Sequence, residues 1–194
     1  RTFPFLGGST VEINDVKSAN QSKNIAVFAG ALEKYNGVDY LLDYWVKYEI
    51  DIELNIFGNG SLSSFVNSVS KENPNVIFHG FKSPDFVNEY MNYALINFCF
   101  RFSRGLDEEF FYPSKFFDVI SNPGLVVCNN FKNIPVDLKD YIYFVDNDMS
   151  DLLSIITDIN DLPSFFDVRL KLLKENHSWE VAINHIFKLI GKDL

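Results

Sequence analysis

The sequence contains only two cysteines in 194 residues, and each lies inside an apolar run far from the other. Two cysteines so placed do not make a disulfide framework, so we expect Cys99 and Cys128 to be buried thiols in a reducing compartment. No apolar run approaches the roughly 20 residues that cross a bilayer, and the first residues have neither the apolar block nor the cleavage site of a signal peptide. These absences predict a soluble, cytoplasmic domain.

Basic residues are also scarce, since 17 lysines and arginines face 26 aspartates and glutamates and the formal net charge is −9. An electrostatic field of that sign repels polyanions, so the composition argues against a nucleic-acid partner. Only three histidines occur, and none has a second ligand at the spacing of a metal site. We therefore expect neither nucleic acid nor a bound metal.

Short apolar, β-branched runs alternate with amphipathic stretches from residue 24 onward. The length fits one α/β domain, and the alternation is typical of βα units around a parallel sheet. The runs predicted to be strands are residues 24–29, 52–57, 76–79, 94–100, 125–128 and 141–145. Apolar residues at helical spacing predict helices at residues 37–49, from 61 onward, and at 83–92, 113–121, 149–159, 163–175 and 178–190.

This order of elements predicts an α/β fold with a doubly wound parallel sheet of about six strands. In such folds the ligand lies at the carboxyl ends of the strands. One crevice at that edge should therefore be faced by Gly30, Gly60, Gly80 and Ser114.

Two segments at the ends of the chain do not fit a self-contained domain. Residues 1–23 follow none of the alternation, so we interpret them as a linker or edge segment from a missing N-terminal domain, with the main domain at residues 24–194. The last predicted helix should expose an apolar patch that marks the interface with that missing domain. The residues expected in this patch are Ile183, Ile186, Phe187 and Ile190.

Glycines follow the first two predicted strands. Gly30 follows the first, and Gly58 and Gly60 follow the second. A residue without a side chain lets a diphosphate approach the backbone, but a plain tight turn explains these glycines about as well. A dinucleotide-binding fingerprint needs a third glycine at the start of the next helix, where this sequence has Ser63. A dinucleotide-dependent oxidoreductase is therefore disfavoured.

Residues 107–118 are the most informative segment. Pro113 favours the first turn of a helix, whose free amides and positive dipole end attract an anion. Ser114 and Asp118 share one helix face about 6 Å apart along the axis, a spacing that suits a phosphate and its ribose. An exposed amphipathic helix in which Lys115 pairs with Asp118 explains the same residues, so both interpretations stay open.

Several short segments recur in a fixed order along the chain, namely residues 27–32, 36–39, 41–42, 54–60, 76–81, 112–118, 122–127 and 178–180. With these segments the sequence resembles, over about residues 24–190, the donor domain of retaining GT-B glycosyltransferases of family four. Each segment alone is weak, but their conjunction in this order is specific. It implies a Rossmann-like domain that is one half of a GT-B fold. Such a domain binds a nucleotide-diphospho-sugar, by analogy a UDP-sugar, and needs no metal or other cofactor.

The resemblance also implies roles for individual residues. Asp118 takes the place of the family's second glutamate, which bonds the ribose hydroxyls, and the loop at Gly80 and Phe81 holds the base. The family's first glutamate falls at Phe110 and is absent, so the neighbouring Glu109 and Glu108 are the candidate catalytic carboxylates. The donor-binding residues implied are Gly30, Ala31, Asn36, Gly58, Gly60, Gly80, Phe81, Ser114, Lys115 and Asp118.

One departure from the family concerns the charge that grips the diphosphate. Typical members carry an arginine and a lysine where this sequence has Ala31 and Asn36. The basic residues that could compensate are Lys34, Arg101, Arg104 and Lys115. The departure keeps a second hypothesis open, in which the chain is a non-catalytic nucleotide-sugar-binding or subunit-interaction module.

The resemblance extends to the reaction and its setting. It implies transfer of the sugar, with retention of configuration, to a lipid-linked or other glycan acceptor such as an O-antigen or capsule intermediate in a bacterium. Acceptors of that kind are assembled at the cytoplasmic face of the cell membrane. We therefore expect a cytoplasmic protein that is peripheral to that face, and a chain that transfers no sugar without its acceptor-binding domain.

Overall fold

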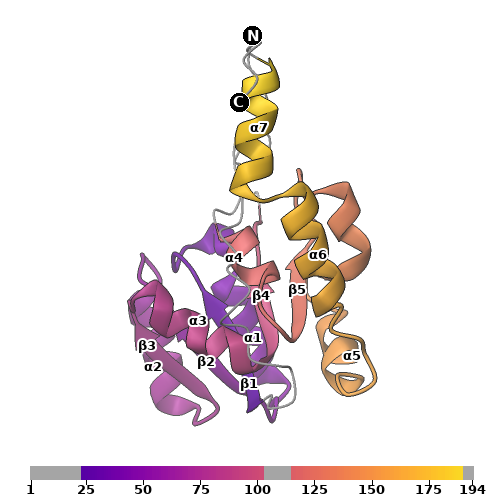
Figure 1. Cartoon of the computed structure of the whole chain (residues 1–194). Coiled ribbons are helices and arrows are strands. Elements are labelled where there is room, and N and C mark those ends of the chain that lie inside the picture. The colour runs from indigo at the N-terminus through magenta and orange to yellow at the C-terminus, as the bar shows by residue number, and fades with distance from the viewer. Residues whose placement is uncertain (1–22, 103–114, 190–194) are drawn as a thin grey trace.

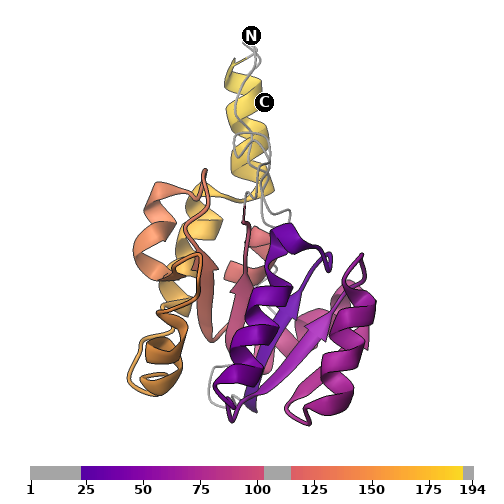
Figure 2. The same cartoon turned by 180° about the vertical axis from the view of Figure 1, so that it is seen from behind.

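The computed structural model describes residues 23–102 and 115–189, which form one parallel sheet with helices on both faces (Figures 1 and 2). The strands are β1 (Lys23–Ala29), β2 (Glu53–Phe57), β3 (Val76–Gly80), β4 (Ala94–Cys99), β5 (Leu125–Asn129) and β6 (Tyr143–Val145). The α-helices are α1 (Val38–Lys47), α2 (Ser63–Glu72), α3 (Pro84–Tyr93), α4 (Phe116–Ile120), α5 (Leu152–Thr157), α6 (Phe166–Asn176) and α7 (Trp179–Leu189). Two short 3₁₀ helices are η3 (Lys34–Asn36) and η4 (Val136–Tyr141).

The strand order in the sheet is β3-β2-β1-β4-β5-β6, and each neighbouring pair is parallel. This is the order of a doubly wound fold, so the predicted fold class is confirmed. Strands β1 and β4 are neighbours although they are not consecutive in the chain. The winding therefore reverses between them, and a crevice is expected at their carboxyl ends.

The core consists of one apolar layer on each face of the sheet. Ala26 and Phe28 of β1 point into the layer that α1, α2 and α5 cover, whereas Val27 points into the layer under α3, α4 and α6. This alternation follows from the period of two in a strand. Both faces of every central strand are thus buried, which explains why these strands read as continuous apolar runs.

Some predicted boundaries are wrong, most clearly in the last third of the chain. The helix expected from Met149 begins at Leu152, and the one expected from Pro163 begins at Phe166. Met149 and Phe165 have φ of 58° and 55°, in the left-handed region that a right-handed helix cannot use. The last strand is also shorter than predicted, because η4 occupies the chain up to Tyr141.

Arg169 of α6 is fully buried and ties α6 to α4 and the turn that follows it. Its guanidinium donates to the backbone carbonyls of Ile120, Ser164, Asn122 and Gly124. Burial lowers the pKa of Arg169 to about 10, which leaves the side chain charged at neutral pH. A cation at the last turn of α4 also meets the negative end of the helix dipole.

Helix α7 stands away from the sheet and packs little against it (Figure 1). Ile183 and Ile186 are 44% and 42% exposed, and Phe187 is half-buried. Partial exposure of these three side chains is therefore confirmed, whereas Ile190 lies outside the described residues. Within residues 23–102 and 115–189, no helix is both long and apolar enough to span a membrane.

Both cysteines are free and buried, as predicted. Cys99 of β4 and Cys128 of β5 are partners in the register of these two strands. Burial raises the pKa of the Cys128 thiol well above its ordinary value, and the neighbouring Cys99 adds to this rise. A thiol with a raised pKa is unreactive at neutral pH.

Candidate functional site

The glycines singled out from the sequence meet at the carboxyl edge of the sheet. The amide of Gly30 donates to the carbonyl of Phe57 at 3.0 Å, and the amide of Gly58 donates to that of Gly80 at 2.9 Å. The turns after β1, β2 and β3 are therefore adjacent, as parallel pairing requires. Of the four residues expected to face one crevice, Gly30, Gly60 and Gly80 lie in these adjacent turns, and Ser114 lies outside the described residues.

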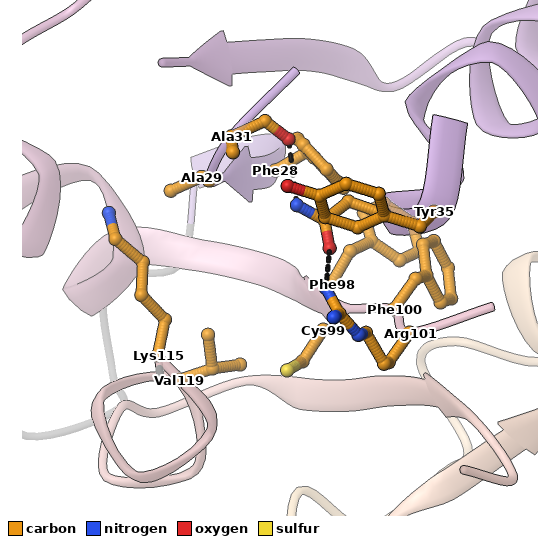
Figure 3. Close-up of a pocket in the computed structure, with 12 residues that line it drawn as sticks. Phe28, Ala29, Ala31, Tyr35, Phe98, Cys99, Phe100, Arg101, Lys115 and Val119 are labelled. Carbon is orange, nitrogen blue, oxygen red and sulfur yellow. Dashed lines mark hydrogen bonds between the residues drawn. The ribbon is translucent and has the colours of Figure 1, made fainter. Parts of the chain in front are cut away.

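A cavity of about 210 Å³ opens at this edge, between the ends of β1 and β4 (Figure 3). Its floor is apolar, and two basic side chains, Arg101 and Lys115, flank it. The lining consists of Phe28, Ala29, Gly30, Ala31, Tyr35, Asn36, Phe98, Cys99, Phe100, Arg101, Lys115 and Val119. This is the position at which doubly wound folds hold their ligands.

A second cavity of about 250 Å³ lies beside the first, toward β2 and β3. Its lining consists of Gly30, Ala31, Phe57, Gly58, Asn59, Phe81, Lys82, Val87 and Lys115. The two cavities share Gly30, Ala31 and Lys115, so we describe them together as the edge groove. Phe81 is 76% exposed and offers an aromatic face at the far end of this groove. Gly60 and Gly80 belong to the adjoining turns but line neither cavity.

The described lining of the edge groove contains no aspartate or glutamate, although the whole chain carries a net charge of −9. Three basic residues line it instead, namely Arg101, Lys115 and Lys82. Fixed positive charge in a partly apolar groove raises the local concentration of anions. The groove is thus suited to an anionic ligand. Within residues 23–102 and 115–189, no three histidine, cysteine, aspartate or glutamate side chains gather to hold a metal.

Gly58 and Gly30 differ in whether the fold itself requires a glycine at that position. A Cβ on Gly58 would lie 1.8 Å from the carbonyl oxygen of Gly30, and Gly58 has φ of 138°, so the fold itself requires glycine there. Gly30 does not have a positive φ, and its nearest neighbour to an added Cβ is Asn36 Nδ2 at 4.0 Å. The fold leaves room for a side chain at Gly30, and that room is the groove.

A carboxylate outside the groove lining locks the turns after β1 and β2 together. Glu33 accepts hydrogen bonds from both the backbone amide and the hydroxyl of Ser61. These two bonds hold the pKa of Glu33 below its ordinary value. The amide of Leu32 also donates to the carbonyl of Asn59 at 2.9 Å. The rim of the groove is therefore preorganised on this side.

Asn36 holds Arg101 beside the loop after β1. The Asn36 amide donates to the Ala31 carbonyl at 2.8 Å, and its oxygen accepts from Arg101 Nη1 at 3.3 Å. The guanidinium also lies over the ring of Tyr35, 4.4 Å from its centroid. Figure 3 shows Tyr35 against Arg101, with Lys115 on the opposite side of the cavity. Partial burial lowers the pKa of Arg101, and Tyr35 opposes this shift.

Lys115, which caps the start of α4, and Val119 of that helix line the groove. Asp118 of α4 does not line either cavity, and its side chain is solvent-accessible. Neighbouring protein atoms raise the pKa of the Asp118 carboxyl by removing water, and Lys115 lowers it. Asp118 lies next to the residues that line the groove. Its hydrogen bonds to the ribose hydroxyls stay a prediction.

Three of the predicted residues, Glu108, Glu109 and Ser114, lie outside the described residues. Of the others, the structure brings Gly30, Ala31, Asn36, Gly58, Phe81 and Lys115 together in the groove lining.

No protein-family model matches the chain, and no curated protein matches it. Solved structures do match. A variant of S. aureus TarM in complex with fondaparinux, alpha-GlcNAc-glycerol and UDP is 16% identical with a TM-score of 0.67, and the match covers 94% of this chain and 38% of TarM. The lipopolysaccharide outer core galactosyltransferase WaaB is 14% identical with a TM-score of 0.68, covering 95% of this chain and 54% of WaaB. An alpha-glucosyltransferase in complex with UDP-glucose and DNA containing an abasic site is 14% identical with a TM-score of 0.67, covering 91% of this chain and 54% of that one.

The chain has the fold of a GT-B Rossmann-like domain. At 14 to 16% identity the likeness concerns the fold, and this chain spans between 38% and 54% of the length of these three proteins.

Tyr35, Lys82 and Asn129 belong to the groove or support it, but the sequence analysis missed them. Asn129 is buried at the end of β5; its side chain accepts from the Arg101 amide at 2.6 Å and donates to the Arg101 carbonyl at 2.7 Å. The signal for Asn129 was a polar residue directly after a buried apolar strand. Nothing comparable marks Tyr35 or Lys82.

Proposed function

We propose that this chain is the donor-binding domain of a glycosyltransferase and that the edge groove binds a nucleotide-diphospho-sugar. The observation that carries the proposal is the charge of the groove. A chain with a net charge of −9 has, at the switch point of its sheet, a groove whose described lining is basic and without carboxylates. A diphosphate is an anion that such a groove would attract.

The solved structures support uridine as the nucleoside. Fold relatives were determined with UDP or UDP-glucose, namely TarM, the pneumococcal O-GlcNAc transferase GtfA and the alpha-glucosyltransferase. For this chain we propose a UDP-sugar as donor. Family four and retention of configuration also belong to this proposal.

The proposed donor lies along the groove with its base against Phe81, beside the turn at Gly80. The diphosphate then crosses Gly30, where the backbone is open, and meets Lys115. Asp118 accepts hydrogen bonds from the ribose, and Ser114 extends the phosphate site. Fixed positive charge stabilises the departing diphosphate without a metal. Glu109 or Glu108 supplies the carboxylate near the donor sugar.

The proposed reaction also needs a binding site for the acceptor. The match covers 38% to 54% of the three relatives, and transfer requires donor and acceptor to be held together with water excluded. We propose that a second domain binds a lipid-linked or other glycan acceptor, such as an O-antigen or capsule intermediate, at the cytoplasmic face of the membrane. The 194-residue chain alone should then bind donor and transfer no sugar.

Isothermal titration calorimetry with a panel of nucleotides tests the proposal. We expect UDP and at least one UDP-sugar to bind with micromolar to millimolar Kd, and GDP, ADP and NAD to bind at least about 10-fold more weakly, a difference of about 1.4 kcal/mol. Binding of none of the UDP compounds would sink the proposal. Binding of NAD in preference to UDP would instead restore the oxidoreductase hypothesis.

Asp118→Ala should weaken UDP binding by about 1.5 to 3 kcal/mol, the range for a lost hydrogen bond to a charged group. This corresponds to an increase in Kd of about 10- to 100-fold. Calorimetry measures it, and circular dichroism checks that the variant is folded.

Asp43→Ala is the matched control for Asp118→Ala. Asp43 is an exposed aspartate on α1 that lines neither cavity, so its loss changes the net charge equally without touching the groove. Its Kd for UDP should stay within about twofold of the wild type, well inside 1 kcal/mol. Equal Kd values for the two variants would return Asp118 to the role of a surface carboxylate.

A further inference from the structure

Arg101 occupies one end of the edge groove and is held there from three sides. Tyr35 covers one face of its guanidinium at 4.4 Å, and Asn36 Oδ1 accepts from Nη1 at 3.3 Å. The Asn129 side chain holds the backbone of Arg101, because it accepts a hydrogen bond from the Arg101 amide and donates one to the Arg101 carbonyl. A guanidinium fixed in this way has already lost the side-chain freedom that binding an anion would otherwise cost.

These contacts join segments that are far apart in sequence. Asn129 lies 28 residues from Arg101 and Asn36 lies 65 residues away. The amide of Phe102 also donates to the Tyr35 carbonyl at 2.8 Å, which fixes the chain just after Arg101 to η3. The loops after β1, β4 and β5 therefore meet at this one arginine.

The order of side chains along the edge groove gives Arg101 a specific place. Phe81 is exposed at one end, Lys115 is shared by both cavities, and Arg101 lines only the cavity at the other end. Tyr35 also lines that cavity, but Arg101 already covers one face of its ring. A nucleotide whose base stacks on Phe81 would thus bring its first phosphate to Lys115 and its second toward Arg101.

We propose that Arg101 binds the second phosphate of the nucleoside diphosphate, with Tyr35 and Asn129 as the residues that position it. This inference rests on the proposed function. It assigns to a residue after β4 the positive charge that Ala31 and Asn36 do not supply. Asn36 connects the two places, since it bonds both the Ala31 carbonyl and the Arg101 guanidinium.

A series of ligands that differ by one group tests the assignment. In calorimetry, Arg101→Gln should bind UMP within about twofold of the wild type, and should bind UDP and UDP-glucose about 10- to 100-fold more weakly. Arg101→Lys keeps the charge but loses the planar stacking and the fork of donors, so it should recover only part of the loss. Lys71→Gln removes the same charge from an exposed position on α2 that lines neither cavity, and should change no Kd more than about twofold.

Asn129→Asp tests the positioning role. Aspartate keeps the oxygen that accepts from the Arg101 amide but loses the donor to the Arg101 carbonyl. The variant should weaken UDP binding severalfold and leave UMP binding unchanged, because only the second-phosphate contact is displaced. A thermal melt within a few degrees of the wild type shows that the fold is intact.

The outcomes separate this inference from the proposed function. If Arg101→Gln weakens UMP as much as UDP, or weakens UDP-glucose alone, the assignment to the second phosphate is overturned while nucleotide binding stands. Unchanged binding of all three ligands overturns it as well. If the wild type binds neither UMP nor UDP, the proposed function fails and the inference falls with it.

Discussion

Replacement of Arg169 by methionine should lower the free energy of unfolding by about 3 to 5 kcal/mol, a large part of the stability of an ordinary domain. The guanidinium is fully buried and donates to four backbone carbonyls, three at the end of α4 and in the turn after it, and one at Ser164 just before α6. A buried polar group left without its partner costs about 1 to 3 kcal/mol, and local relaxation recovers part of the sum. Urea denaturation followed by circular dichroism measures the change.

Two variants sharpen the Arg169 experiment. Arg169→Lys keeps a cation but can serve fewer carbonyls, so its loss should be intermediate. Lys171→Met removes an exposed cation from the same helix, where a 4.0 Å ion pair with Glu175 contributes about 0 to 1 kcal/mol. A loss below about 1 kcal/mol in Arg169→Met would show that water can replace the guanidinium, contrary to the burial seen here.

The fold could be predicted from the sequence because buried parallel strands and amphipathic helices leave a strong apolar pattern. Strands β1 and β5, for example, read as continuous apolar runs since both faces of each are covered. The helix starts at Leu152 and Phe166 could not be predicted. They depend on the left-handed conformations of Met149 and Phe165, which their side chains do not favour and tertiary packing imposes.

The candidate site was only partly predictable, for a related reason. Gly30 and Lys115 follow local signals, a glycine after a strand and a lysine at a helix start. The support of Arg101 by Asn129 and Asn36 depends on contacts across 28 and 65 residues. One sequence carries no local mark of such contacts. The resemblance to family four indicated where charge was lacking but could not indicate which residue replaced it.

A pair of neighbouring glycines offers the clearest separation of fold from function. Gly58→Ala should be destabilising by about 2 to 4 kcal/mol, because its Cβ would overlap the Gly30 carbonyl oxygen at 1.8 Å and its φ of 138° is strained for alanine. Thermal or urea unfolding measures that loss. Gly58→Ala is therefore the control for Gly30→Ala, because it shows that a steric clash within the fold lowers the free energy of unfolding.

Gly30→Ala should behave in the opposite way, with unchanged stability and about 10- to 100-fold weaker binding of UDP, or about 1.4 to 2.8 kcal/mol. An added Cβ meets nothing closer than Asn36 Nδ2 at 4.0 Å, and alanine restricts the unfolded chain, so the variant should be as stable as the wild type or more stable by up to about 1 kcal/mol. The methyl group would instead occupy the place where both cavities meet, and where the diphosphate is proposed to approach the backbone. Calorimetry and a melting curve on the same sample decide the matter: a stable Gly30→Ala protein that binds UDP as well as the wild type would mean that the ligand does not cross Gly30.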